Sequence, residues 1–152
     1  MTLESKDELK AHYASTRILL MEAIEGLNEE QMRDASMDGW SVCDHLVHIT
    51  VWDELRRTEI ERIGDGGLPS WRLEDGNRVE DYNQLTVALR RHLPVAQVLH
   101  DLEASRRRLL DTISSASDLA LDASRYGGSG LRSSHEAEHA GWIREWRQSR
   151  GI

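Results

Sequence analysis

The fold is decided by residues 39–63, GWSVCDHLVHITVWDELRRTEIERI, which predict a turn followed by one long helix. Ser41 and Asp44 have the spacing of a capping box, in which each side chain bonds the backbone amide of the other residue. Gly64 and the glycines that follow it end the helical pattern. The apolar positions exceed one stripe: the main stripe is Val42, Leu46, Ile49, Ile60 and Ile63, and beside it lie Val47, Val51, Trp52 and Leu55. We therefore expect the helix over 42–63 to be the most central one.

Three more helices are predicted by the same kind of pattern, over about 5–27, 94–113 and 133–148. The first and the last of them begin with further capping boxes, formed by Ser5 with Glu8 and by Ser133 with Glu136. Each of the three helices has one apolar stripe, which indicates that one face is buried against a partner.

The connections between the helices are unequal in length. Residues 64–80 form a long connection that is followed by a short helix over 81–92, and residues 116–132 form a second long connection. The sequence therefore predicts an all-α fold, a four-helix bundle with long connections between helices 2 and 3 and between helices 3 and 4. At 152 residues we expect a single helical domain over residues 1–152.

Charge and composition exclude two classes of partner. The formal net charge is −8, so the chain lacks the basic face that nucleic acid requires, and residues 106–108, three arginines, are interpreted as a solvated helix face. No stretch approaches the roughly 20 apolar residues that span a bilayer. Cys43 is the only cysteine, and the N-terminal segment has no signal-peptide pattern. We expect a cytoplasmic protein that binds neither nucleic acid nor membrane.

Two of the seven histidines, His135 and His139, are four residues apart on the last predicted helix. This spacing places both imidazoles on one helix face, where they can share a metal ion. Trp142 and Trp146 continue the same face, which suggests that the pair points toward the interior. Two inward imidazoles are difficult to satisfy by hydrogen bonds alone, so the pair is a candidate metal site.

A third ligand would have to come from another helix, and the helix over 42–63 offers His45 and His48. If helices 2 and 4 run parallel, as in simple up-and-down order, His48 and His139 lie at similar depths from their helix starts. A crossover in the 64–80 connection would void this argument. The residues alone leave both histidines open.

Two segments resemble motifs of the DinB-like (DinB/YfiT-like) superfamily. Residues 39–53, GWSVCDHLVHITVWD, resemble the motif W-S-x-x-[DE]-x-L-x-H-[LI], and residues 135–143, HEAEHAGWI, resemble H-x-x-[EQ]-H-x-x-x-[IL]. The resemblance implies that His48, His135 and His139 hold a divalent metal ion inside a four-helix bundle. It thereby chooses His48 over His45.

The resemblance also implies a class of chemistry. Three imidazoles with open coordination positions suit Zn²⁺ or Ni²⁺ best, and Fe²⁺, Mn²⁺ or Co²⁺ less well. The implied function is that of a metal-dependent transferase or hydrolase acting on a small electrophile, with a low-molecular-weight thiol as a candidate cofactor. The alternative is a non-catalytic, stress-associated or ligand-binding bundle with a structural or vestigial metal site. A fourth protein ligand would close a structural site, whereas a catalytic site stays open.

Several other polar residues lie near these histidines in the sequence. The carboxylates that could serve as a fourth ligand, as a hydrogen-bond partner of a ligand or as a general base are Asp44, Asp53, Glu136 and Glu138. The simpler interpretation is that Asp44 and Glu136 cap helices and Glu138 faces solvent. Cys43 lies on the first turn of a helix, which lowers a thiol pKa, but a small buried side chain is the better interpretation. Surface or hydrogen-bonded helix positions are assigned to His12, His92 and His100.

The tryptophans predict a pocket and, less directly, an interface. Trp40, Trp52 and Trp142 are expected to wall an apolar pocket at the end of the bundle where helices 2 and 4 begin, with glycine-rich residues 127–130 as a lid. The apolar surplus of the helix over 42–63, together with Trp71 on a polar connection, predicts a homodimer.

Overall fold

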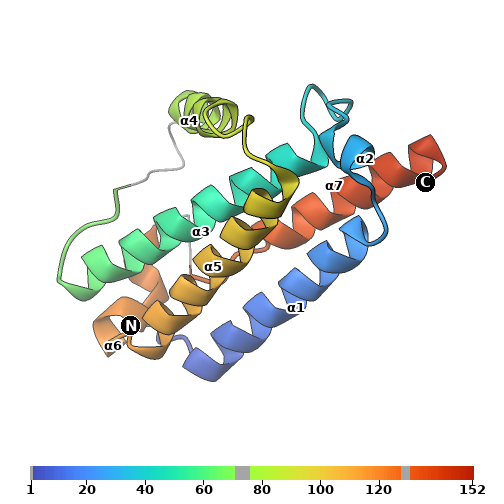
Figure 1. The fold of residues 1–152 in the computed structure, drawn as a ribbon. Helices are drawn as coiled ribbons and strands as arrows, with labels where there is room; N and C mark the ends of the chain where they lie inside the picture. Colours follow the sequence, from blue (N-terminus) through green and yellow to red (C-terminus); the bar gives the residue numbers. More distant parts are fainter. Residues whose placement is uncertain (1, 71–75, 128–130) are drawn as a thin grey trace.

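A computed structural model describes residues 2–70, 76–127 and 131–152. The long helices are α1 (Lys6–Ile24), α3 (Val42–Gly64), α5 (Val95–Ser114) and α7 (His135–Arg150), and they pack side by side (Figure 1). Shorter segments join them: α2 (Glu29–Arg33), α4 (Gly76–Ala88), α6 (Asp118–Leu121) and the 3₁₀ turn Ala123–Tyr126. The described residues form no β-strand, so the predicted all-α fold is confirmed. None of the helices in these ranges is long and apolar enough to cross a membrane.

Capping side chains set the starts of α3 and α1, with the full predicted capping box at α3 and only its Ser5 half at α1. The backbone amide of Asp44 donates to Ser41 Oγ at 3.1 Å, and the amide of Ser41 donates to Asp44 Oδ2 at 3.0 Å. At α1, the amide of Glu8 donates to Ser5 Oγ at 3.3 Å. These bonds satisfy amides that the first turn of a helix leaves without partners, which fixes where each helix begins.

The long helices do not follow simple up-and-down order. α3 and α5 run parallel, as two ion pairs show. Asp44 at the start of α3 lies near Arg91, just before α5, and Asp53 pairs with Arg106 further along both helices. α7 runs antiparallel to α3 (Figure 1). The parallel arrangement of helices 2 and 4, which the comparison of His48 with His139 assumed, is therefore not the one observed. The chain after α3 is long enough to return through α4 to the end at which α3 began, and α5 then repeats the direction of α3.

α3 and α7 meet through their N-terminal turns. His45 lies next to His139, and His48 lies next to His135, so the pairs run in opposite directions along the two helices. Glu136, at the start of α7, bonds Thr16 near the middle of α1. The histidines therefore lie within the length of the bundle, and the prediction of a pocket at its end is corrected.

The core consists of two apolar clusters with a polar layer between them. The first cluster includes Leu20, Leu46, Leu102 and Ile143. The second cluster includes Leu9, Tyr13, Ile60 and Leu109. Between the two clusters, buried polar side chains from all four long helices bond to one another, and these are Thr16, Asp53, Arg106 and Glu136.

Arg106 connects the polar layer through both edges of its guanidinium group. Its Nε donates to Asp53 Oδ2 at 2.8 Å, and its Nη1 donates to Glu136 Oε1 at 3.1 Å. Thr16 Oγ1 donates to the same Glu136 oxygen at 2.7 Å, and Arg17 Nε donates to Glu136 Oε2 at 2.8 Å. Buried charges need partners and hydrogen bonds of this kind, because an unpaired ion in the interior costs several kcal/mol.

This layer corrects two predictions. Arg106 is buried, so a solvated face exists only at Arg107 and Arg108. The third capping box is also wrong, because the amide of His135 donates to Ser133 Oγ at 3.1 Å while the Glu136 carboxylate turns inward. A carboxylate on the buried side of α7 gains more from two arginines than from a backbone amide at the helix start.

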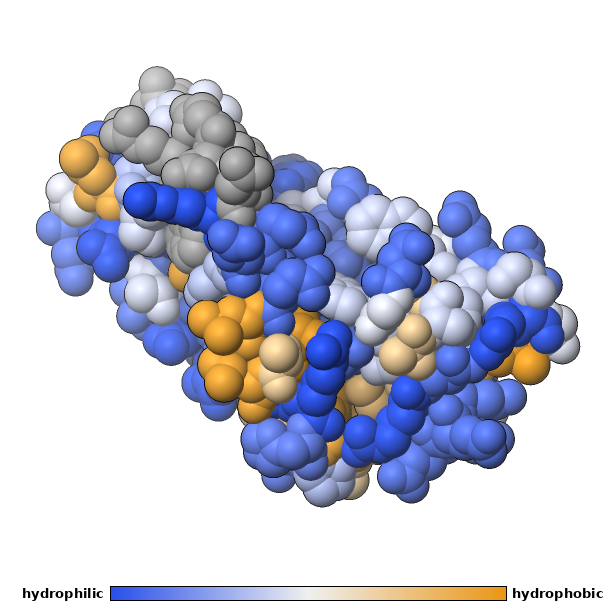
Figure 2. Space-filling model, turned by 90° about the horizontal axis from the view of Figure 1, so that it is seen from above, coloured by the Kyte–Doolittle hydropathy of each residue, from blue (hydrophilic) through white to orange (hydrophobic). Residues whose placement is uncertain are grey.

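The extra apolar surface of α3 is covered within the chain. Val47 and Val51 are buried while Trp52 and Leu55 are partly buried, which weakens this argument for a homodimer, and Trp71 lies outside the described residues. Figure 2 shows the face on the α4 side as mostly hydrophilic, with its largest hydrophobic patch near the middle and smaller ones toward both ends. α4 and the turn after it expose Leu85 (58%) and Leu89 (64%). The homodimer stays a prediction.

Candidate metal centre

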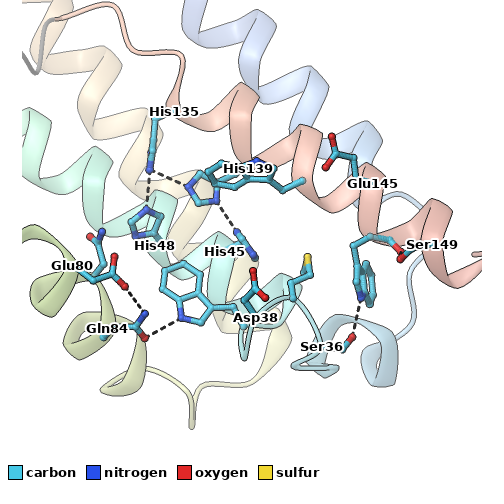
Figure 3. A pocket seen from close by; sticks show the side chains of 15 residues that line it. Ser36, Asp38, His45, His48, Glu80, Gln84, His135, His139, Glu145 and Ser149 are labelled. Atoms are coloured by element: carbon cyan, nitrogen blue, oxygen red, sulfur yellow. Dashed lines mark hydrogen bonds between the residues drawn. The ribbon is translucent and has the colours of Figure 1, made fainter. Parts of the chain in front are cut away.

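Three histidines from two helices come together next to the polar layer, with His135 one residue from Glu136. His48 lies on the second turn of α3, and His135 and His139 lie on the first two turns of α7. The Nε2 atom of His135 is 2.8 Å from that of His48 and 3.0 Å from that of His139 (Figure 3). Each ring offers one nitrogen to a group whose ligand atoms all lie within 4.8 Å of one another. These are the three residues that the family motifs select.

Hydrogen bonds alone satisfy this cluster poorly. Each ring nitrogen carries either one proton or one in-plane lone pair, so it makes one linear hydrogen bond. The Nε2 of His135 nevertheless faces two other ring nitrogens at hydrogen-bonding distance. In addition, Nδ1 of His48 is buried and has no hydrogen-bond partner among the described residues. A divalent cation would accept the three Nε2 lone pairs together, so the cluster fits a metal ion.

Burial keeps the three imidazoles neutral. It lowers the pKa of His48 from 6.5 to about 3 and that of His135 from 6.5 to about 4. The pKa of His139 is lowered as well, first by burial and then by the neighbouring histidines. A neutral imidazole has the free lone pair that a metal ion binds. The cluster is therefore in its metal-binding form at neutral pH.

His45 also points at this cluster, but from the other side of His139. Its Nδ1 lies 2.6 Å from His139 Nδ1, the ring nitrogen that does not face His135. The ring is buried and lies edge-on to His139, with the centroids 4.9 Å apart. The sequence alone left His45 and His48 open, and the structure brings both to α7 in different positions.

A cavity of about 740 Å³ lies over the cluster, and His48, His135 and His139 line it. This volume lies within the range of small-molecule sites, roughly 300–1,000 Å³. Tryptophan side chains and polar groups form much of the remaining wall, which includes Trp40, Trp142, Trp146, Asn83 and Gln84. Trp40 Nε1 donates to Gln84 Oε1 at 3.2 Å, which joins the turn before α3 to α4 across the cavity (Figure 3).

Two of the three tryptophans predicted as pocket walls line the cavity. Trp40 and Trp142 line the cavity, and Trp142 is 49% exposed, so it forms an outer wall. Trp52 does not line it. Its ring instead lies 6.1 Å from that of His48 and 6.0 Å from that of His135, centre to centre, and its Nε1 donates to Asn83. Of the predicted lid, residues 128–130 lie outside the described residues.

None of the four candidate carboxylates joins the group of three histidines. Asp44 caps α3, while Asp53 and Glu136 bind Arg106. Glu138 is exposed and accepts a hydrogen bond from Ser134 Oγ at 3.2 Å. The described residues therefore supply three ligands and no fourth one, so a bound ion would keep coordination positions toward the cavity.

Cys43 faces away from this cavity. It is buried and lines a separate cavity of about 150 Å³ together with Arg33 and Arg91. Burial raises the pKa of its thiol, which outweighs the nearby Arg33. A raised pKa makes a thiol a poor nucleophile, so the interpretation of Cys43 as a small buried side chain is supported.

Comparisons with known proteins agree with this fold and family. A family model described as the DinB superfamily matches residues 12–143. The fold is similar to the crystal structure of an uncharacterised protein from Escherichia coli UTI89, with a TM-score of 0.77 and 18% sequence identity. That match covers 97% of this chain and 95% of the other. No curated protein matches the sequence.

Proposed function

The chain belongs to the DinB superfamily, and we propose that it is a metal-dependent enzyme, a transferase or hydrolase that acts on a small electrophile. One observation carries the proposal: three neutral ring nitrogens converge at a cavity, and no fourth protein ligand joins them within the described residues. His48, His135 and His139 would hold the ion. Three imidazoles suit Zn²⁺ or Ni²⁺ best, with Fe²⁺, Mn²⁺ and Co²⁺ as weaker candidates.

A divalent ion in this position would supply Lewis-acid activation of a nucleophile or of an electrophilic centre near neutral pH. The protein's own residues shape the space around it. Trp40 and Trp142 offer flat apolar faces, and Asn83 and Gln84 on α4 offer amide groups. Such a wall can bury the apolar part of a small molecule and orient its polar part.

The charges around the cavity favour a substrate that is uncharged or positively charged. Asp38, Glu80 and Glu145 line the cavity, and its lining within the described residues contains no lysine or arginine. Neither Asp38 nor Glu145 has an ion-pair partner in the described part of the chain. An anionic substrate would therefore meet the field of these carboxylates without a compensating cation.

If the enzyme is a transferase, its proposed second substrate is a low-molecular-weight thiol. The chain's own thiol is not available, because Cys43 is buried and lines a different cavity. A nucleophilic sulfur at the histidine cluster would therefore have to come from a diffusible molecule, and the cavity of about 740 Å³ has room for two small reactants.

A reaction panel tests the proposal. Neutral and cationic electrophiles are offered with water or with small thiols to three samples: zinc-loaded protein, chelator-treated protein and His139→Ala. We expect turnover only in the zinc-loaded sample, while His100→Ala, which changes an exposed histidine on α5, keeps full activity. Turnover that persists unchanged after complete metal removal would reject the mechanism. Inactivity of the loaded protein across the panel would favour the non-catalytic bundle.

A further inference from the structure

His45 occupies a position that neither the metal cluster nor the fold explains. It lies on the first turn of α3, one turn before His48, and is only 6% exposed. Its nearest polar contact is His139, at 2.6 Å between the two Nδ1 atoms (Figure 3). The indole ring of Trp40 lies edge-on to it, with centroids 5.2 Å apart. The imidazole thus lines the cavity itself, between Trp40 and a candidate metal ligand.

The proton on His139 determines what His45 can do. His139 Nε2 faces the Nε2 of His135, so metal binding there requires a lone pair on His139 Nε2. A neutral imidazole carries one proton, which must then sit on His139 Nδ1. The Nδ1 atom of His45 is within reach to accept it. In the opposite arrangement His45 would donate, and the proton of His139 would occupy the nitrogen that faces the metal.

The hydrogen bond from His139 to His45 leaves one polar atom of His45 without a partner, which indicates that His45 has a role in the site. With His45 Nδ1 as the acceptor, the proton of His45 is on Nε2, which is buried and has no hydrogen-bond partner among the described residues. A buried donor without a partner destabilises the folded state, because it loses its hydrogen bonds to water and gains none in the protein. A side chain kept only for packing would not need this polar atom, because an apolar residue of similar size fills the space without the penalty.

We propose that His45 is a positioning residue of the metal site: its Nδ1 accepts the proton of His139 Nδ1 and holds the His139 ring with Nε2 toward the ion. The inference rests on the proposed metal site at His48, His135 and His139. Metal-bound histidines commonly donate their second ring N–H to a carboxylate, a carbonyl or water, which fixes the ring and raises its basicity. Here another imidazole takes that place.

Zinc affinity, measured by competition with a chromophoric chelator, tests the proposal. His45→Leu removes the acceptor while keeping the volume, and His45→Asn keeps an amide group near the position of Nδ1. We expect His45→Leu to weaken zinc binding about 10- to 100-fold with unchanged stoichiometry, and His45→Asn to restore most of the affinity. We also expect the melting temperature of metal-free His45→Leu to stay close to that of the wild type, because one buried unpaired nitrogen replaces another.

The outcomes separate this inference from the function on which it rests. Wild-type affinity in His45→Leu would overturn the positioning role and leave the metal site intact. Loss of zinc stoichiometry equal to that of His139→Ala would overturn it too, because His45 would then be a ligand. Equal losses in His45→Leu and His45→Asn would show that the amide cannot stand in for Nδ1 and would contradict the hydrogen bond. A wild-type protein that binds no zinc would reject the metal site itself.

Discussion

Arg106 and Glu136 face each other across the centre of the bundle, with Nη1 3.1 Å from Oε1 and Nη2 3.2 Å from Oε2. Glu136 directly follows His135, and Arg106 also binds Asp53 on α3. The ion pair therefore ties the start of α7, where the candidate ligands lie, to both α3 and α5. The same geometry predicts that removal of any one partner leaves the remaining buried charges without compensation.

Removal of one partner from this layer should destabilise the protein strongly. We expect Arg106→Met to lower the free energy of unfolding by about 3–5 kcal/mol, because Asp53 and Glu136 are left buried with less positive charge near them. Urea denaturation of the metal-free protein measures the change. Arg107→Met is the matched control, since Arg107 is exposed, and it should change stability by no more than about 0.5 kcal/mol. Equal effects of the two substitutions would contradict the role given to Arg106.

The histidine cluster predicts how the stability of the metal-free protein depends on pH. Burial lowers the pKa of His48 to about 3 and that of His135 to about 4, below the ordinary 6.5 of the unfolded chain. As the pH falls below 6.5, the unfolded state takes up protons that the folded state cannot. The free energy of unfolding should therefore fall between pH 6.5 and about 4.

Thermal melts in the presence of a chelator measure this dependence. The double variant His48→Gln with His135→Gln should lose stability less steeply over the same pH range, because its folded and unfolded states differ by fewer protons. His92→Gln, which changes an exposed histidine, should retain the slope of the wild type. A wild-type melting temperature that stays constant from pH 7 to pH 4 would contradict the neutral, buried cluster.

We also propose that the protein forms a homodimer, now through the α4 side of the molecule. The motive is the exposed pair Leu85 and Leu89, 58% and 64% exposed, on a face that is otherwise mostly hydrophilic (Figure 2). Sedimentation at micromolar concentration should give a dimer for the wild type and a monomer for Leu85→Glu with Leu89→Glu. A wild-type mass of 17.4 kDa would reject the dimer.

The sequence predicted the helices well because their signals are local. Ser41 and Asp44 define the start of α3, and the glycines after Ile63 define its end. Helix direction stayed open, because apolar periodicity is the same for a parallel and an antiparallel neighbour. α2 was missed, since five residues are too few for a periodic pattern.

The polar layer was missed although the pattern contained a sign of it. Arg106 stands four residues after Leu102 and three before Leu109, on the buried stripe of α5. Glu136 likewise precedes Ala140 and Ile143 at helical spacing, on the buried side of α7. Charged residues in apolar stripes on two helices suggest a buried pair. Which of them meet depends on the helix arrangement, which no single helix encodes.

For the histidine cluster, too, the sequence predicts the local spacing, while the helix arrangement decides which side chains meet. The spacing of His135 and His139 is local, and it placed both on one face of α7. His45 and His48 are three residues apart on one side of α3, and both are buried. Only the antiparallel crossing of α3 and α7 sets His48 against His135 and His45 against the far side of His139.

The central claim is that His48, His135 and His139 together hold one divalent ion, and metal content tests it most directly. The wild type and the three single alanine variants are purified without nickel columns, stripped with chelator, reloaded with Zn²⁺ and analysed by mass spectrometry of the metal. We predict about one ion per chain in the wild type and in His100→Ala, and a large loss in each variant of the three. Full occupancy in any two of the three variants would contradict the claim.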